Sequence, residues 1–440
     1  MGFDRRLLSL LLLLAVVGVP AGILRVLCVG RACDEPVKAA AEVPFCSLPE
    51  EVRSLLAAGF REGRSPDLLG ITGAAPVGTE GPGAIAVAWP SVESSAERVP
   101  LGFFGGHIEP PSGALSEIAL DDVAPTIARL MGIERPHPEV RSGTPADQVT
   151  ADEPAPLVVE IVWKGIGSDD LEAAPAAWRQ LARRMTTGAG TLDATVPSVP
   201  LDPAAVLTTI GAGGVPAQHG VTGAVVRSDA GAPVRAWSRK APVVVIAALG
   251  DDLDELTDQR ARVGLVAADA IDRGLIGADW YADTDRDDVA ITRRGTQAVR
   301  LVRDWVDAGY GADAVPDLLA VTLTGTVEDM DETTEAIADV VTDRRAEATL
   351  VVTATGSAAT DGALGADELV RRIERSVPAK PRVVAAAAPG GLFLDQDVLA
   401  AEGATEDEVI TAMREITAPG GERVFADVFP AIAVSFGRYC

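Results

Sequence analysis

Lysine, histidine and aromatic residues are scarce in this chain of 440 residues. It contains three histidines, four cysteines and 4% aromatic residues, and its only lysines are Lys38, Lys164, Lys240 and Lys380. No two cysteines form a CxxC pair, which argues against a cysteine-based metal site. Ala, Val, Gly, Asp and Arg dominate instead, a usage that is common in high-GC bacterial genomes.

Acidic residues outnumber basic ones, with 64 Asp and Glu against 38 Lys and Arg, so the formal net charge is −26. A surface this negative repels the phosphates of nucleic acids and acidic lipid head groups, so neither is an expected partner. At the same time 48% of the residues are hydrophobic, which is enough to bury a large core in one big domain or in two.

An apolar segment opens the chain. Two arginines precede a largely apolar run over residues 7–29, which is long for a signal peptide and just long enough for a membrane span. We expect residues 1–32 to be a signal peptide or signal anchor, with the segment 7–29 in the membrane and the rest of the chain outside the cytoplasm. Secretion after cleavage behind Ala32 is the alternative. Any protein or small-molecule partner stays open.

The exported cysteines can pair, because disulfides persist outside the cytoplasm. Cys33 and Cys46 bracket a short segment just beyond the apolar run, and Cys440 is the last residue. We expect a bridge between Cys33 and Cys46, with Cys46–Cys440 as the alternative.

Apolar runs without alternation are separated by helical segments along most of the chain. Strands are expected at residues 68–73, 84–89, 99–104, 157–163, 243–248, 263–267, 318–323, 349–353 and 383–387. Helices are expected at residues 49–60, 121–131, 171–185, 294–308, 331–345, 366–376 and 405–416. Together they predict an α/β fold, a three-layer α/β/α sandwich with a mostly parallel central sheet.

Three stretches resemble the alkaline phosphatase superfamily, nearest to its phosphodiesterase and nucleotide pyrophosphatase branch. Residues 158–166 form an apolar strand and turn, and residues 208–223 read TTIGAGGVPAQHGVTG. Residues 99–133 begin with a VPL strand and continue into an Asp-x-x-Pro-Thr helix. The resemblance implies an alkaline-phosphatase-like fold. In the family the third stretch follows the other two, so its early place here looks like a circular permutation.

The resemblance implies a single domain over residues 33–440. Residues 33–133 resemble the family's C-terminal segment, and residues 157–440 resemble its N-terminal and central core. Residues 134–156, rich in Pro, Glu, Asp, Ser and Thr, are the predicted connector between them. Two independent domains are the alternative.

The resemblance also implies hydrolysis of phosphate esters by two divalent metal ions, held by about six Asp and His ligands. Lys164 stands where the family has its first Asp ligand. Thr322, Thr324 and Thr326 replace the family's Asp-x-x-x-His loop, and residues 353–356, Thr-Ala-Thr-Gly, replace Ser-Asp-His-Gly. The chain therefore departs from the family's pattern at each position where a metal motif is expected.

The three histidines of the chain do not supply either metal motif at another position. His107, His137 and His219 are expected to be structural or exposed, since none follows an Asp in the family's spacing. By the resemblance, the nucleophile falls in the loop before Thr208. Ser198 is the best candidate, with Thr195 and Thr208 weaker.

Charge balance decides between the two functions that the resemblance allows. A site with two metals carries about four positive charges and needs anionic or imidazole ligands. Threonine and alanine cannot supply these, and Lys164 adds charge of the wrong sign. We expect a catalytically degenerate member of the superfamily with no cofactor and with an extracytoplasmic binding or structural role. Candidate binding residues are Lys164, Thr208 and Thr209, with Lys164 as a possible anion ligand.

The alternative is an active metal-dependent phosphodiesterase or phosphatase that uses two divalent metal ions, Zn or Mn. Its ligands would come from carboxylates near strand ends and loops: Asp169, Asp170, Asp202 and Asp269.

Overall fold

The computed structural model describes residues 44–73, 77–80, 85–109, 115–278, 280–281, 286–359, 364–377, 382–418, 420–437 and 440. The chain divides into two compact units, Met1–Ser47 and Leu48–Cys440. Helix α3 (Pro44–Ser47) is the described part of the first unit. The predicted membrane segment at residues 7–29 lies outside the described residues. Within them, no helix has both the length and the apolar character of a membrane span.

A seven-stranded sheet forms the core of the second unit. In spatial order its strands are β10 (Asp288–Ile291), β9 (Val263–Ala267), β11 (Asp317–Leu323), β5 (Leu157–Trp163), β12 (Thr349–Ala354), β4 (Glu97–Gly105) and β6 (Ala189–Val196). The first five strands are parallel to one another, and β4 is antiparallel to both of its neighbours, β12 and β6. The predicted fold class, an α/β fold with a mostly parallel central sheet, is confirmed.

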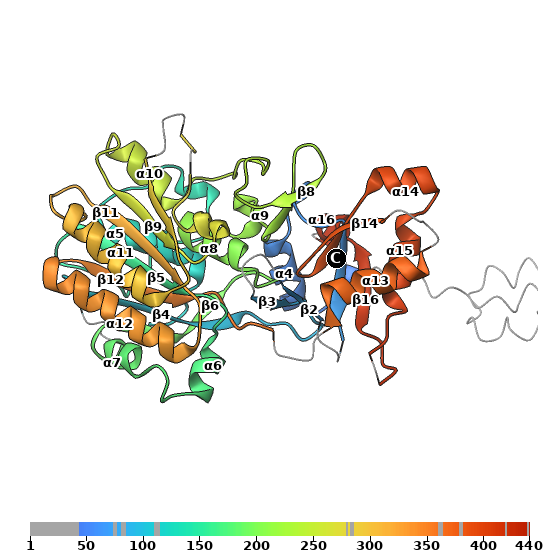
Figure 1. Ribbon diagram of the computed structural model, residues 1–440, viewed down its shortest axis with the longest axis horizontal. Coiled ribbons are helices and arrows are strands. Elements are labelled where there is room, and N and C mark those ends of the chain that lie inside the picture. The colour runs from blue at the N-terminus through green and yellow to red at the C-terminus, as the bar shows by residue number, and fades with distance from the viewer. Residues whose placement is uncertain are drawn as a thin grey trace, which may run out of the picture. The chain divides into compact units, whose positions relative to one another are not determined.

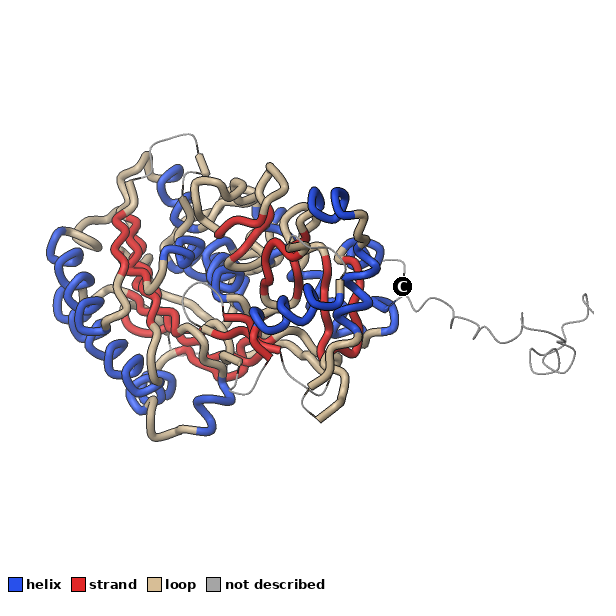
Figure 2. Tube along the Cα trace, turned by 45° about the vertical axis from the view of Figure 1, so that its right-hand side comes forward, coloured by secondary structure: helices blue, strands red, loops and turns tan. Residues whose placement is uncertain are grey.

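Helices cover both faces of this sheet, as Figures 1 and 2 show. One face packs under α5 (Val123–Leu130), α8 (Pro203–Ala212) and α10 (Leu249–Leu256). The other face packs under α7 (Arg179–Thr187), α11 (Gly295–Ala308) and α12 (Val327–Arg344). Every residue of β5 is therefore buried, with Val158 and Val162 in the first core and Val159 and Ile161 in the second. This double burial explains why the strand's sequence is apolar at every position except Glu160.

Segments that are far apart in the sequence share the sheet. Strand β4, which holds residues 99–104, pairs with β12, and β12 pairs in turn with β5. The helix expected at residues 171–185 is instead two helices, α6 (Ser168–Ala173) and α7. Pro175 lies between them and cannot continue a helix, because it has no N–H to donate.

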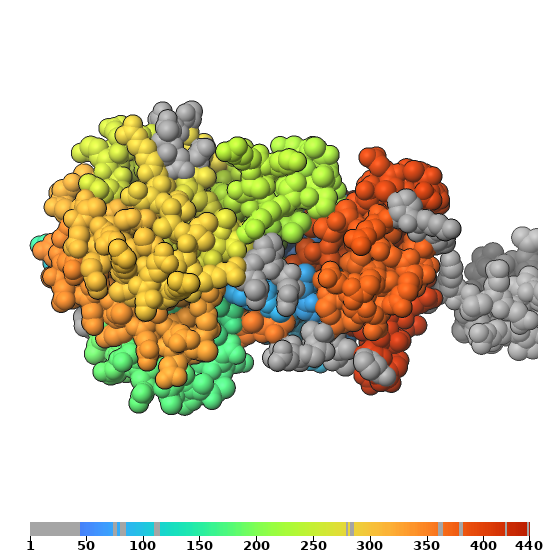
Figure 3. All heavy atoms as spheres, in the orientation of Figure 1, coloured from blue at the N-terminus to red at the C-terminus, as the bar shows by residue number. Residues whose placement is uncertain are grey.

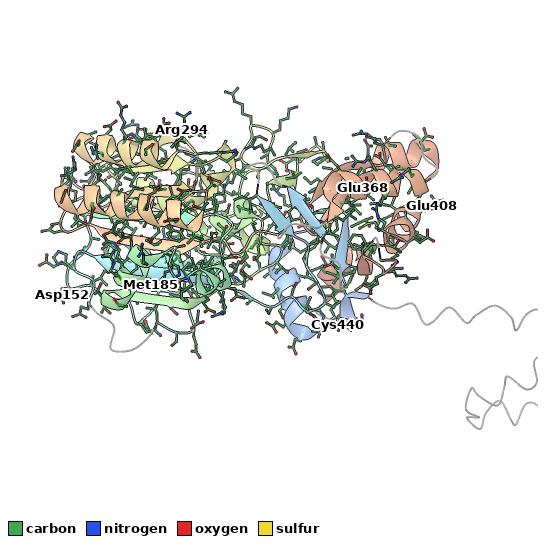
Figure 4. All side chains as sticks on the ribbon, turned by 60° about the horizontal axis from the view of Figure 1, so that its bottom comes forward. Asp152, Met185, Arg294, Glu368, Glu408 and Cys440 are labelled. Carbon is green, nitrogen blue, oxygen red and sulfur yellow. The ribbon has the colours of Figure 1, made fainter. Side chains whose placement is uncertain are left out.

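A second sheet is antiparallel throughout. Its strands are β14 (Val384–Ala388), β15 (Gly391–Leu394), β1 (Leu68–Thr72) and β16 (Phe425–Pro430). Helices α13 (Ala366–Ser376), α14 (Gln396–Glu402) and α15 (Glu406–Arg414) share its core. Glu368 on α13 and Glu408 on α15 mark two of these helices in Figure 4. The strand predicted at residues 383–387 belongs to this sheet and not to the parallel one.

Smaller elements complete the unit. They are helices α4 (Glu50–Gly59), α9 (Pro216–His219) and α16 (Ile432–Phe436), 3₁₀ turns η2 (Leu120–Asp122), η3 (Pro138–Val140) and η4 (Ala270–Leu275), and strands β2 (Val77–Glu80), β3 (Ala86–Ala88), β13 (Leu364–Gly365), β7 (Val225–Arg227) and β8 (Pro233–Arg235). The strand predicted at residues 243–248 is wrong, because these residues form a loop that leads into α10.

The predicted connector, residues 134–156, is fixed to the core although it has little regular structure. Arg135 Nε lies 2.7 Å from Asp252 Oδ2, and Arg141 Nη2 lies 3.1 Å from the same oxygen. The two arginine side chains are 5% exposed and the carboxylate is 0% exposed. Loss of one partner would leave buried charge unpaired, so these contacts hold the connector firmly against α10.

Candidate functional site

Lys164 directly follows β5, at the carboxyl edge of the parallel sheet. Ligands of open α/β sheets bind at such edges. Here, however, the lysine side chain is enclosed: Nζ donates to Asp272 Oδ1 at 2.5 Å, with the lysine side chain 1% and the aspartate side chain 0% exposed. The structure therefore places a complete, buried ion pair at the position where the sequence resemblance expects a metal ligand.

Asp272 belongs to η4, which follows strand β9, and its other oxygen also has partners. Oδ2 accepts a hydrogen bond from Thr322 Oγ1 at 2.6 Å and from the Asp269 backbone N–H at 2.9 Å. Thr322 lies on β11, next to β5, and accepts in turn from the Ala268 N–H. With one cation and two further donors, the carboxylate is satisfied without a metal.

Asp202 lies close enough to Lys164 for the two charges to interact. It caps α8, where Oδ1 accepts from the Ala204 N–H at 3.0 Å, and the residue is 1% exposed. Burial raises the pKa of Asp202, while the Ala224 and Ala204 N–H groups and the Lys164 charge oppose that rise. No group in the described part of the chain meets hydrogen-bond geometry with Oδ2, so the Ala224 N–H acts on the carboxylate only as a nearby dipole.

Asp269, another of the four carboxylates considered as alternative ligands, has arginine partners. It pairs with Arg235 and, at 3.3 Å, with Arg293. Burial alone would raise the pKa of Asp269, but the Ile271 N–H, Arg235 and Lys164 together lower it. This carboxylate is ionised and already neutralised by cationic side chains.

The last two candidate carboxylates are engaged with other groups. The Asp169 side chain is 82% exposed and lies 2.6 Å from Arg98. Asp170 Oδ2 accepts from the Gly167 N–H and from Ser357 Oγ, both at 2.8 Å. Asp170 thereby fixes the start of α6 to the end of β12, which is a structural task.

Ser198, the candidate nucleophile, is 1% exposed, and Oγ has no hydrogen-bond partner among the described residues. The buried histidine nearest in sequence, His219, is also occupied: Nδ1 accepts from the Val221 N–H at 3.2 Å, and Nε2 lies 3.1 Å from Thr209 Oγ1. Because Nδ1 accepts, Nε2 carries the proton and donates to the threonine. Burial, with help from Arg61, lowers the pKa of His219 to about 3. The imidazole is neutral and structural.

The candidate binding residues are hydrogen-bonded within the protein. Thr208 Oγ1 donates to Ala204 O at 2.7 Å within α8, Thr209 bonds His219, and Lys164 bonds Asp272. The other two histidines make only peripheral contacts with acids: the His107 side chain, 29% exposed, lies 3.8 Å from Glu153, and that of His137, 77% exposed, lies 3.3 Å from Glu139.

The threonines that replace the family's metal motifs also have structural roles. Thr326 caps α12, where its Oγ1 accepts from the Asp329 N–H at 3.1 Å. Thr355 Oγ1 accepts from the Gly165 N–H at 2.9 Å, which ties the turn after Lys164 to the end of β12. Gly165 has φ +79°, a left-handed conformation that favours glycine, so this tight turn depends on residue type.

The donors that a metal pair needs do not converge here. Among the described residues, no three or more His, Cys, Asp or Glu side chains form a group that could hold a metal ion. The residues at the carboxyl edge therefore do not fit the two metals that the resemblance implies. Cys46 and Cys440 are both disulfide-bonded, and Cys33 lies outside the described residues.

Asp272 is the residue that sequence reasoning missed. Its partner Lys164 lies 108 positions away, so no local pattern joins the two. A signal did exist, because Asp272 follows the apolar strand β9, and parallel neighbours bring their carboxyl ends to one edge of a sheet.

No protein-family model and no curated protein matches the chain. Among solved structures, wild-type alkaline phosphatase PafA is similar, with 14% identity and a TM-score of 0.46 over 64% of this chain and 85% of that chain. A PafA variant with several substitutions has 14% identity and a TM-score of 0.41 over 64% of this chain and 86% of that chain. At this level of identity, no ligand, metal or activity is transferred to this chain.

Proposed function

We propose that this chain is a catalytically degenerate member of the alkaline phosphatase superfamily, with a binding or structural role outside the cytoplasm. The observation that carries the proposal is the contact of 2.5 Å between Lys164 Nζ and Asp272 Oδ1, with both side chains 1% exposed or less. The motifs at residues 99–133, 158–166 and 208–223 support the superfamily, and the ion pair supports the loss of its chemistry.

The electrostatic penalty for a metal beside this lysine is large. An ammonium and a divalent cation 4 Å apart repel each other by roughly 8 kcal/mol at an effective dielectric constant near 20. That figure matches or exceeds the free energy with which many proteins fold, about 5–15 kcal/mol. In contrast, Lys164 and Asp272 together are neutral, so the ion pair needs no further charged ligand.

An active metal-dependent hydrolase is the second candidate, because two buried polar atoms lack partners. Ser198 Oγ and Asp202 Oδ2 have no hydrogen-bond partner within the described chain. They supply a hydroxyl and a carboxylate in the region where the resemblance expects the nucleophile. This candidate requires Lys164 to separate from Asp272. Each of the two buried charges would then lack its partner and would carry its own desolvation cost.

Metal content and hydrolysis separate the two candidates. We expect the full-length protein, incubated with zinc or manganese and desalted, to hold no stoichiometric metal by elemental analysis. We expect its hydrolysis of bis(4-nitrophenyl) phosphate to equal that of Ser198→Ala, because neither has a metal to activate the serine. Two metal ions per chain, with turnover that Ser198→Ala abolishes, would establish the active hydrolase instead.

The variant Lys164→Asp tests the charge argument directly. It would place a carboxylate beside Asp272, Asp202 and Asp269, and four acids without a cation repel one another. We expect its melting temperature to rise by several degrees with 1 mM Mn²⁺ or Zn²⁺, on the order of the shift that tight ligand binding gives. The wild type should shift by less than about one degree under the same conditions. Equal shifts in both proteins would contradict the charge argument.

The extracytoplasmic location is part of the proposal. The apolar run at residues 7–29 supports membrane anchoring, and the disulfide-bonded Cys46 and Cys440 support an oxidising compartment. We expect the protein to sediment with membranes, and protease added outside intact cells to digest it. Recovery in the soluble fraction of lysed cells, protected from external protease, would contradict this location.

A further inference from the structure

A cavity of about 250 Å³ lies beside the two-stranded sheet formed by β7 and β8. Its walls come mainly from three parts of the chain: lining residues within 220–226, including Val226 of β7, lining residues within the segment 236–244, and Ala278 with Trp280. Arg64 also lines it. The segment 236–244 reaches the surface in the view of Figure 3, where it is yellow-green, and Val243 is 69% exposed. The cavity is thus open to solvent, unlike the enclosed ion pair at Lys164.

Trp237 stands in this cavity at a conformational cost. Its φ is +61°, a left-handed conformation that bulky residues rarely adopt. Its indole Nε1 is buried without a hydrogen-bond partner among the described residues. Costs of about 1–3 kcal/mol of this kind persist where the surrounding structure enforces them, and they are concentrated at ligand sites.

The neighbouring turns enforce that position. The Ala236 N–H donates to Ala224 O at 2.9 Å, and the Ala241 N–H donates to Ser238 O at 2.8 Å. Trp237 packs against a buried cluster that includes Ala204 and Ile271. These two residues belong to α8 and η4, and η4 also carries Asp272 of the ion pair.

Arg64 supplies the cavity's positive charge. In the described structure its guanidinium makes one hydrogen bond, from Nη2 to Val243 O at 3.4 Å, although a guanidinium carries five N–H donors. Burial lowers the pKa of Arg64, an effect that the charge of Asp229 opposes and that of Arg61 reinforces. None of the described residues that line the cavity is acidic, in a chain whose formal net charge is −26.

We infer that this cavity binds a small carboxylate with one flat apolar group. The apolar group lies between Trp237 and Trp280, and the carboxylate accepts two N–H bonds from Arg64, the geometry that a guanidinium favours. The volume of about 250 Å³ lies just below the range of about 300–1,000 Å³ for pockets that hold drug-sized ligands, so it suits a single ring and not a larger molecule. This inference does not depend on the proposed function, because it holds whether or not Lys164 replaces a metal.

Calorimetric titration of the full-length protein with three related probes tests it. Phenylacetate carries the ring and the charge, phenylacetamide keeps the shape without the charge, and phenethylamine reverses the charge. We expect saturable binding of phenylacetate, binding of phenylacetamide at least tenfold weaker, and no binding of phenethylamine. Stronger binding of the amide or of the amine would overturn the assignment to carboxylates.

Three variants locate the binding. Arg64→Met keeps the apolar stem and removes the charge, so phenylacetate should bind at least tenfold more weakly while phenylacetamide binding stays unchanged. Ala241→Phe should fill the cavity and abolish binding of both. Arg294→Met is the matched control, since Arg294 is exposed at the start of α11 (Figure 4) and should leave binding unchanged. No saturable binding of any probe at about 20 mM, or binding insensitive to both Arg64→Met and Ala241→Phe, would overturn the inference.

Discussion

Lys164→Met should lower the free energy of unfolding by about 3–5 kcal/mol, because it leaves a buried carboxylate without its cation. Asp272 is 0% exposed, so bulk solvent does not reach the carboxylate to replace the ammonium. Its two remaining donors, Thr322 Oγ1 and the Asp269 N–H, are neutral. Urea denaturation followed by circular dichroism at pH 7 measures the change. Lys240→Met is the matched control, since Lys240 is exposed, and it should change stability by less than about 0.5 kcal/mol.

The double variant Lys164→Met/Asp272→Asn separates pairing from simple loss of a side chain. Asparagine keeps an oxygen for Thr322 and the Asp269 N–H but carries no charge, so no unpaired ion remains. We expect the double variant to recover most of the stability that Lys164→Met loses, with a coupling energy of several kcal/mol. If the stability lost in the double variant equals the sum of the losses in Lys164→Met and Asp272→Asn, the two charges do not depend on each other.

The central sheet could be predicted because its strands are recognisable one at a time. Strands β5, β11 and β12 are mostly apolar runs without alternation, and such runs are typical of parallel strands buried on both faces. The antiparallel sheet could not be predicted, because β1 pairs with strands more than 300 positions away. Local sequence does not encode which distant strand is the partner.

Residues 243–248 show the converse error. Val243, Val244 and Val245 have high β-propensity, but none of the described strands pairs with them, and Val243 is 69% exposed. The Val245 N–H donates to His219 O in a loop contact instead. Propensity describes how a residue fits a sheet that other strands must supply. The same limit applies to the site. The position of Lys164 directly after a buried strand marks it as unusual in the sequence, but only the tertiary structure shows that Asp272 is its partner.

Glu160→Gln should stabilise the protein at alkaline pH by up to about 5 kcal/mol. Glu160 lies on β5 opposite Ala320 and Val351, is 2% exposed, and its Oε1 has no partner among the described residues. Burial raises the pKa of Glu160 from 4.5 to about 8. Between those values the unfolded chain is ionised while the native residue stays protonated, so the native state binds more protons. Stability therefore falls as pH rises through this range and levels off above it.

The difference between wild type and variant isolates this one carboxyl group. Other shifted groups, such as Asp251 with its pKa raised by burial to about 7 and His219 with its pKa lowered by burial to about 3, titrate in both proteins and cancel. Urea midpoints at intervals from pH 4 to pH 9 should therefore coincide near pH 4 and diverge steadily up to pH 8, with the variant more stable. Glu402→Gln, on the exposed end of α14, should track the wild type throughout. A gap that is constant with pH would mean that Glu160 is ionised in the folded protein, and its buried oxygen would then need a cation that the sheet does not provide.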